Sequence, residues 1–419
     1  MHLIPVNNRR KTSILRNNPE RLLGIMSLKL NRHHPVFSKF VKCFSEPEQW
    51  TKDRFHIDSF GMSGNKTKIL HIAPMNISGV PGQFVHAQRR LGFDSRLVTL
   101  FRDKRGYYED ICLDLPFIDS ASTRWLKQWV SNPGKLHVDN ISRVPEKIPI
   151  VWSPHSASER LFVRLRDLIW TPRIEWAIRR YELDKFDVIQ LDGGLGLYRS
   201  GKFVQKLDKK IICCYTGSDL RTRGVIKALD EKAVVNVTVE FDHLRLHPDI
   251  HHVFFPFDVK PFPRRHPAGT ILRIGHAPTN RAAKGSDIII PVLERLKREE
   301  GIEIDLIENL PYREAIERKR RCDVFVDQIG DLGYGINALE ALAMEIPCCS
   351  CLAAGFARIY PDHPFIQTDG ADLYDTLKDL IHRPEVIREK GIEGREWVQK
   401  YHDPLSVVRR IHELAGIED

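Results

Sequence analysis

Short apolar runs alternate with segments of helical periodicity along most of the chain. The first example starts with the apolar run 68–73 and continues through a Gly/Pro loop at 76–82. A helical segment from Phe84 to Leu91 follows, and a second apolar run covers 96–100. A strand–helix–strand order of this kind predicts a parallel sheet covered by helices. Further strands are predicted at 188–191, 210–215, 234–239 and 252–255.

A proline-rich stretch at 256–267 separates this series from a second one, because proline continues neither a helix nor a central strand. The second series has predicted strands at 271–275, 303–307, 323–327 and 347–350, and predicted helices at 285–299, 311–320, 337–344 and 385–416. We therefore expect an α/β protein with two Rossmann-like domains that face each other across a cleft. The predicted division is an N-terminal extension (1–65), a first domain (66–258), a linker (259–270), a second domain (271–400) and a closing C-terminal helix (401–419).

Positive charge is concentrated in the N-terminal extension. Residues 1–65 hold 11 Lys and Arg against 5 Asp and Glu, whereas the whole chain of 419 residues has a formal net charge of +9. The remaining residues are nearly balanced, which argues against a dedicated nucleic-acid-binding protein. Three interpretations of the extension stay open: a flexible tail, an arm that binds a membrane surface or a partner, and a segment upstream of a translation start at Met62.

Hydropathy and cysteine usage narrow the class of protein further. The hydrophobic content of 42% is typical of a globular protein, and no apolar run approaches the roughly 18 residues that span a bilayer. The N-terminal end lacks the apolar core of a secretory signal, so the expected location is the cytoplasm. Eight cysteines are present; Cys348 and Cys351 form a CxxC, but no second ligand pair lies nearby, so we predict buried thiols and no metal site.

Residues 121–181 differ from the rest because they contain five of the seven tryptophans and many arginines. The run 160–170 can form a basic amphipathic helix. One interpretation is an ordinary helix that packs its apolar face on the first domain. The other is a surface for an anionic membrane or a lipid-linked acceptor, with peripheral contact at the inner face of a membrane.

The glycine-rich loop 328–335 follows a predicted strand and opens a predicted helix. Backbone N–H groups at a helix start form an anion site, which suits a diphosphate. Glu340, expected in the opening turn, can accept hydrogen bonds from paired ribose hydroxyls. The alternative is that the glycines only make a turn and that Glu340 only complements the helix dipole.

Three further groups of residues follow predicted strands. Arg281 and Lys284 lie at the expected start of the next helix, a position that disfavours cations. Two cations are favourable there if they bind a doubly charged anion between them. The alternative is that both are solvated surface charges. Asp219 and Arg221 could bind sugar hydroxyls or pair with each other across a turn. A loop with Gly79 and Gly82 would allow a ligand to approach the backbone closely.

Together these residues resemble family 4 of the retaining glycosyltransferases with the GT-B fold. The resemblance covers roughly residues 66–416. Its motifs are the run Gly333-Tyr334-Gly335 with Leu339-Glu340 and Pro347, the set His276, Arg281, Lys284 and Gly285, the pair Asp327-Gln328, the run Gly217 to Arg221, and the terminal set Gly391, Gly394, Arg395, Val398, His402 and Asp403.

The resemblance implies a nucleotide-sugar donor held mainly by the second domain, and transfer of the sugar with retention, commonly without a metal or other cofactor. Lys284 would contact the donor diphosphate and Glu340 the ribose. The donor-binding set would be Gly79, Gly82, His276, Lys284, Asp331, Gly333, Tyr334, Gly335, Asn337 and Glu340. Lys284, Arg281 and Glu340 are the candidate catalytic residues, and Asp219 and Arg221 the candidates on the acceptor side. The expected acceptor is a glycan, a lipid-linked molecule or a cell-envelope polysaccharide.

The chain departs from the family in two places: Arg281 lies closer to Lys284 than the family's arginine normally does, and one of the family's glutamates is missing. Eight residues before Glu340, where the family usually has a second glutamate, the chain has Leu332, with Asp331 beside it. Asp331 or a main-chain amide would then replace the usual sugar contact. Two other functions stay open: a non-catalytic nucleotide-sugar-binding protein, which Leu332 favours, and a sugar-nucleotide epimerase of the same fold.

Overall fold

A computed structural model of the protein describes residues 66–103, 106–116, 149–154, 156–266, 271–330 and 333–418. The predictions for the extension 1–65, for all of 121–148, and for Asp331 and Leu332 therefore fall outside the described residues.

The first sheet contains seven parallel strands in the order β3-β2-β1-β4-β5-β6-β7. The order from β3 to β6 is that of the Rossmann fold, in which the chain reverses its direction of winding between β1 and β4. The strands are β1 (Lys68–Ala73), β2 (Asp94–Thr99), β3 (Ile111–Cys112), β4 (Val188–Asp192), β5 (Lys210–Tyr215), β6 (Val235–Thr238) and β7 (Ile250–His252).

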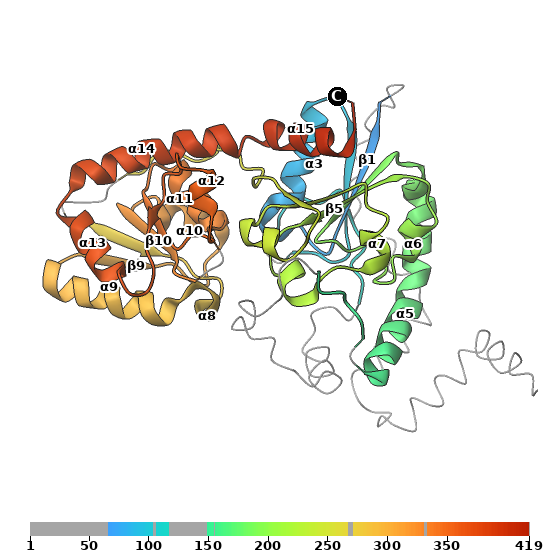
Figure 1. Ribbon diagram of the computed structural model, residues 1–419, viewed down its shortest axis with the longest axis horizontal. Coiled ribbons are helices and arrows are strands. Elements are labelled where there is room, and N and C mark those ends of the chain that lie inside the picture. Colours follow the sequence, from blue (N-terminus) through green and yellow to red (C-terminus); the bar gives the residue numbers. More distant parts are fainter. Residues whose placement is uncertain are drawn as a thin grey trace, which may run out of the picture. The chain divides into compact units, whose positions relative to one another are not determined.

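Helices accompany this sheet as the alternating pattern predicted (Figure 1). The helix after β1 begins earlier than expected, because Pro81 and Gly82 form its first turn. The basic segment 160–170 lies within one longer helix, α5, which contains Pro172. The helices are α3 (Val80–Arg90), α5 (Ala157–Tyr181), α6 (Lys202–Gln205) and α7 (Lys227–Asp230).

The second sheet contains five parallel strands in the order β12-β11-β10-β8-β9. Renumbered from its first strand, this is the 2-1-3-4-5 order of flavodoxin-like sheets, and it reverses between β8 and β10. The strands are β8 (Arg273–His276), β9 (Glu303–Leu306), β10 (Val324–Gln328), β11 (Cys348–Ser350) and β12 (Ile366–Gln367). The predicted fold class, an α/β protein with two parallel sheets, is confirmed.

The four helix starts predicted for the second series, at 285, 311, 337 and 385, each lie within one residue of the start of one of its observed helices. The observed helices are α8 (Arg281–Lys284), α9 (Ser286–Glu300), α10 (Tyr312–Lys319), α11 (Ile336–Ala343), α12 (Phe356–Ile359), α13 (Leu373–Ile381), α14 (Pro384–Tyr401) and α15 (Pro404–Ala415). The sequence did not predict β3, β12, α6, α7, α8, α12 or α13; all of these except α13 have four residues or fewer and therefore carry little periodicity.

The strands were predictable because parallel strands are buried on both faces and therefore read as continuous apolar runs. In β1, for example, Ile69, Leu70 and Ile72 are 0% exposed. The cysteine pairs 213–214 and 348–349 are also fully buried, as predicted. Burial raises the pKa of the Cys213 thiol to about 12, so this side chain behaves as a small apolar group.

The terminal motif of the sequence serves the packing of helix α11. A side chain at Gly391 would meet the backbone oxygen of Glu345 at 2.2 Å, so α14 can approach the end of α11 only with glycine here. Arg395 donates to the backbone oxygens of Ala343 and, at 3.0 Å, of Phe262. These contacts fix the C-terminal end of α11. The last helix, α15, packs against α3 of the first sheet (Figure 1).

Candidate functional site

The carboxyl ends of β8 and β10 define the most informative place in the second sheet. These two strands are neighbours, and the chain leaves them in opposite directions, so the loops that follow them diverge. In open parallel sheets, ligands bind at this position. The loop after β8 leads into α8, and the loop after β10 leads into α11.

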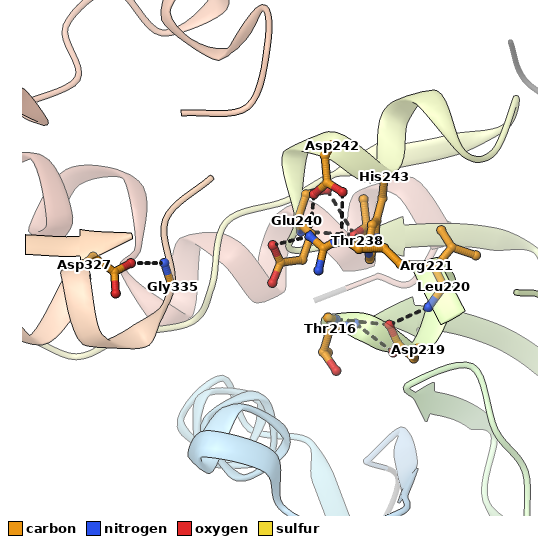
Figure 2. A network of polar contacts seen from close by, with 11 residues as sticks. Thr216, Asp219, Leu220, Arg221, Thr238, Glu240, Asp242, His243, Asp327 and Gly335 are labelled. Carbon is orange, nitrogen blue, oxygen red and sulfur yellow. Dashed lines mark hydrogen bonds and ion pairs between the residues drawn. The ribbon is translucent and has the colours of Figure 1, made fainter. Parts of the chain in front are cut away.

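Lys284 and Asp327 join these two loops. The Lys284 Nζ lies 2.6 Å from Oδ1 of Asp327, with the lysine side chain 14% and the aspartate 1% exposed. The other carboxylate oxygen of Asp327 accepts the backbone N–H of Gly335 at 3.1 Å, a contact that Figure 2 shows. One buried carboxylate thus holds both the lysine and the start of α11 in place.

The start of α11 has no side-chain cap. Its flanking residue Gly335 lies close to the lysine, because a Cβ built on Gly335 would be 3.5 Å from the Lys284 Nζ. Gly333 has a φ of +87°, a conformation that favours glycine. An uncapped helix start beside an ammonium group is electropositive, and Asp327 is the carboxylate that faces it. The arrangement can bind an anion such as a diphosphate.

Glu340 lies in the second turn of α11 and not in the opening turn that the sequence suggested, because the helix begins at Ile336. Its Oε2 accepts a hydrogen bond from the Lys319 Nζ at 2.6 Å. Lys319 also donates to Oδ1 of Asn337 at 2.9 Å, and the Asn337 amide donates to the backbone oxygen of Ala277 at 2.9 Å. The predicted residues Asn337 and Glu340 are therefore brought together by a lysine that the sequence analysis missed.

Two predicted donor-binding residues direct their side chains into the protein. Both ring nitrogens of the fully buried His276 are occupied, one by Ser286 Oγ and one by the backbone oxygen of Val326, each at 2.8 Å. Burial lowers the pKa of His276. The Tyr334 ring stacks on Phe365 at a centroid distance of 4.6 Å. The polar atoms of both side chains are thus used within the protein, since the Tyr334 hydroxyl also lies 3.2 Å from Nε2 of His402.

Arg281 and Lys284 are the first and last residues of the four-residue helix α8, so they do not open the long helix α9 together. Arg281 is 58% exposed and makes a two-pronged ion pair with Glu308, at 2.8 and 2.6 Å. This contact lowers the pKa of Glu308. The two predicted cations thus have different carboxylate partners, and Lys284 is the one at the switch point.

The predicted loop of the first sheet is held by a buried asparagine. Gly79 has a φ of +76° at the start of α3. The Gly82 N–H donates to Oδ1 of Asn76 at 3.0 Å, and a Cβ at Gly82 would lie 2.7 Å from the Asn76 amide nitrogen. Both glycines therefore allow a tight approach of backbone and side chain within this loop.

Asp219 and Arg221 do not pair with each other. The Asp219 carboxylate accepts the backbone N–H groups of Thr216, Gly217 and Leu220 at 2.8–3.1 Å. Arg221 donates to Oδ2 of Asp242 at 2.7 Å and to Oε2 of Glu240 at 2.9 Å, as Figure 2 shows. The charged atoms of both predicted acceptor-side residues are thus used within the protein.

The cluster of Arg221, Glu240 and Asp242 places two carboxylates on one guanidinium. Burial raises the pKa of Glu240 to about 7, although the nearby Arg221 opposes the shift. The same two carboxylates raise the pKa of Arg221 against the effect of burial. No sequence signal identified Glu240 or Asp242, because they lie about twenty residues after Arg221.

Within the described ranges, no group of three or more His, Cys, Asp and Glu side chains is placed to bind a single metal ion. No helix of these ranges is long and apolar enough to span a membrane.

Comparison with solved structures assigns the fold class. Sucrose-phosphate synthase from Thermosynechococcus elongatus is 14% identical, with a TM-score of 0.54 over 83% of this chain and 98% of that one. S. aureus TarM is 11% identical, with a TM-score of 0.51 over 86% and 100%. Anabaena HepE, solved in complex with UDP-glucose, is 11% identical, with a TM-score of 0.50 over 83% and 99%. The chain therefore has the two-sheet GT-B fold of glycosyltransferases. No protein-family model matches the sequence, and no curated protein matches it either.

Proposed function

We propose that the protein is a glycosyltransferase that moves a sugar from a nucleotide-diphospho-sugar to an acceptor. The observation that carries the proposal is the Lys284 ammonium beside the uncapped start of α11, at the switch point of the second sheet. This arrangement suits a diphosphate. The fold supports the proposal, since similar structures include one solved with UDP-glucose and an α-glucosyltransferase solved with UDP.

The proposed reaction breaks the bond between the anomeric carbon and the diphosphate oxygen. Negative charge grows on the departing diphosphate, and positive charge grows on the sugar. Lys284 and the N–H groups at the start of α11 stabilise that growing charge more than they stabilise the bound donor, and this difference accelerates the reaction. Arg281 contributes only if a bound donor draws it away from Glu308.

Retention of the anomeric configuration, a hexosyl donor and independence from metal are further parts of the proposal. The departing diphosphate itself takes the acceptor proton, so no separate nucleophile or general base is required. Glu340 binds the ribose, and Asp331 or a main-chain amide of 333–335 contacts the sugar.

For the acceptor we propose a glycan, a lipid-linked molecule or a polysaccharide, reached from a peripheral position on a membrane. Helix α5 supports this part of the proposal. It exposes Leu161 (57%) and Leu168 (52%), and Arg160 and Arg164 are exposed beside them. Apolar and cationic side chains on one stretch of helix suit an anionic lipid surface. Flotation with vesicles of anionic and of neutral lipid, comparing wild type with Leu161→Ser/Leu168→Ser, tests it.

Thermal unfolding with UDP, GDP, ADP and CMP tests the donor site. A ligand at a hundred times its Kd adds about 2.7 kcal/mol to the free energy of unfolding. We expect one of the diphosphates to stabilise the protein and Lys284→Ala to lose that effect. The absence of stabilisation by every nucleotide would refute the proposal.

A donor-turnover assay separates the three candidate activities. A transferase consumes nucleotide-sugar faster when acceptor is present, and an epimerase converts the donor without any acceptor. A non-catalytic binding protein, which Leu332 in place of the family's usual glutamate favours, binds the donor and leaves it intact.

A further inference from the structure

Lys319 is a lysine whose ammonium group is enclosed by the protein. It ends helix α10, and its side chain is 1% exposed. Its Nζ lies 2.6 Å from Oε2 of Glu340 and 2.9 Å from Oδ1 of Asn337, and it lies over the ring of Phe325 at 4.8 Å from the centroid. No ligand can reach a group enclosed in this way, so any role of Lys319 in binding must act through the residues that it contacts.

A contribution to stability does not by itself explain why the buried ion pair of Lys319 and Glu340 is present. Removing two charges from water is expensive, and two well-packed apolar side chains often stabilise a protein as much or more. Helices α10 and α11 could therefore be joined without charge. Glu340 lies on the helix that begins at the candidate diphosphate site. A carboxylate at this place indicates a role in ligand binding, and Lys319 compensates its charge.

Lys319 also connects Glu340 to the rest of the site. Asn337 accepts from Lys319 through its Oδ1, and its amide nitrogen donates to the backbone oxygen of Ala277. Ala277 directly follows β8, in the segment that leads to Lys284. One enclosed ammonium group thus sets the position of Glu340 and of the first turn of α11 against the loop that carries Lys284.

Tyr312 marks the side from which a ligand could approach Glu340. It starts α10 and lies seven residues before Lys319, so both side chains leave the same face of the helix. Unlike Lys319, the Tyr312 side chain is 42% exposed. Burial first, and then the charge and a hydrogen bond of Glu340, raise the pKa of Tyr312. Glu340 itself is only 5% exposed: Lys319 holds its carboxylate from inside, and Tyr312 lies on its solvent side, so a ribose reaches the carboxylate only by replacing Tyr312 there.

We propose that Lys319 is a positioning residue for a ribose site, in which it fixes one oxygen of Glu340 so that the carboxylate receives the vicinal hydroxyls of a nucleoside diphosphate. The proposal rests on the function proposed above, and it assigns a task to a residue that touches neither donor nor acceptor. It predicts that Lys319 controls the preference for ribose over deoxyribose rather than binding of the diphosphate.

The test compares the Kd of ribonucleotides and their 2′-deoxy forms by calorimetry, with UDP, GDP and ADP as probes. A hydrogen bond from a hydroxyl to a carboxylate favours the ribose form by about tenfold or more. We expect the wild type to show this preference. In Lys319→Met, the Kd of the ribonucleotide should rise to that of the deoxynucleotide, whose own Kd should stay within about threefold of the wild-type value.

Arg318→Met is the matched control. Arg318 is the neighbouring residue of α10 and also pairs with a carboxylate, that of Asp305, but it lies 39% exposed and does not contact Glu340. We expect it to keep the wild-type preference for ribose. If Lys319→Met does not fold, Lys319→Arg replaces it: the charge is kept, the larger guanidinium displaces Glu340, and the preference should fall while the diphosphate still binds.

The outcomes separate the two proposals. If no nucleotide binds the wild type, the proposed function fails and the ribose site fails with it. If a nucleotide binds but the wild type does not distinguish ribose from deoxyribose, only the ribose site is refuted. The assignment of Lys319 is also overturned if a folded Lys319 variant keeps the full preference, or if it weakens the ribose and deoxyribose forms equally, as a purely structural role would.

Discussion

The two sheets use the polar groups at their switch points in opposite ways. In the second sheet, the switch point between β8 and β10 carries the Lys284–Asp327 ion pair, whose lysine remains 14% exposed. In the first sheet, the switch point between β1 and β4 carries His71, which is 0% exposed and bonded at 2.8 Å to both Asp192 and Gln88. The same topology thus places a partly exposed ion pair at the switch point of the second sheet and a fully buried hydrogen-bond network at that of the first.

The difference shows which charges a ligand can reach. The enclosed network of the first sheet continues from Gln88 to His412 on α15, at 3.3 Å, and so ties the C-terminal helix to the sheet. A polar group whose partners are all supplied by the protein stabilises the fold. A cation with one carboxylate partner and an uncapped helix start beside it can take a second anion. On this basis, charges of the first sheet should affect stability, and Lys284 should affect activity.

The largest expected effect is on stability, from Arg221→Met in the first sheet. The substitution leaves the buried carboxylates of Glu240 and Asp242 without their shared cation, which costs about 3–5 kcal/mol of unfolding free energy. Denaturant unfolding measures the loss, and calorimetry measures nucleotide binding in parallel. The Kd for nucleotide should not change; a stable variant with lost transfer activity would instead place Arg221 in the acceptor site.

Lys284→Ala should affect turnover nearly as strongly. Loss of one charge that stabilises the departing diphosphate costs about 3 kcal/mol, or roughly a hundredfold in kcat. Arg281→Ala, which removes a cation already paired with Glu308, should cost much less, and the exposed Lys297→Ala should cost nothing. Steady-state kinetics with the donor identified by thermal unfolding gives all three values. Equal losses of kcat in Lys284→Ala and Arg281→Ala would instead indicate that both side chains bind the diphosphate.

The pH dependence of stability should reveal Glu240. Its pKa is about 7 in the folded protein against an ordinary value near 4.5, so the folded state binds more protons between these pH values. Its contribution to stability is therefore present below about pH 4.5 and is lost as the pH rises towards 7. Between pH 5 and 8 the wild type should lose about 2 kcal/mol of unfolding free energy relative to Glu240→Gln.

The comparison with Glu240→Gln is needed because buried histidines act in the opposite direction. Burial lowers the pKa of His243 and His252 to about 4 and that of His402 to about 3. Their contribution to stability rises with pH. Glu231→Gln, at an exposed position directly after helix α7, is the control. Parallel stability curves of wild type and Glu240→Gln would show that the Glu240 carboxyl is already ionised at pH 5.

Asp219→Ala should have the smallest effect. Three backbone N–H groups lose their acceptor, but they lie in a partly exposed turn where water can replace it, so the expected cost is about 1–2 kcal/mol of unfolding free energy. Thermal unfolding measures the loss. A fall in kcat at unchanged stability would contradict the structural role and favour a contact with the acceptor.

Much of the fold was predictable from local patterns. The apolar runs of β1, β4 and β5 identified central strands because a parallel strand buries both faces. The loop that carries Lys284, and the glycine loop before α11, were also identified, because a strand followed by a glycine loop and a helix is a local pattern. The two-residue strands β3 and β12 were missed because they contain too few residues to show any periodicity.

The pairing of the charges was decided only by the tertiary structure. Lys319 stands in the strongly charged segment 317–321, which indicates a solvated surface, yet it is the residue that the packing of α10 against α11 encloses. Arg221 pairs with Glu240 and Asp242, which follow a different strand, and Tyr334 turns into an aromatic cluster although its loop carries a sequence motif. Local sequence reports which face of an element is apolar, whereas the partner of a charge depends on which elements meet, and that is fixed only when the whole chain has packed.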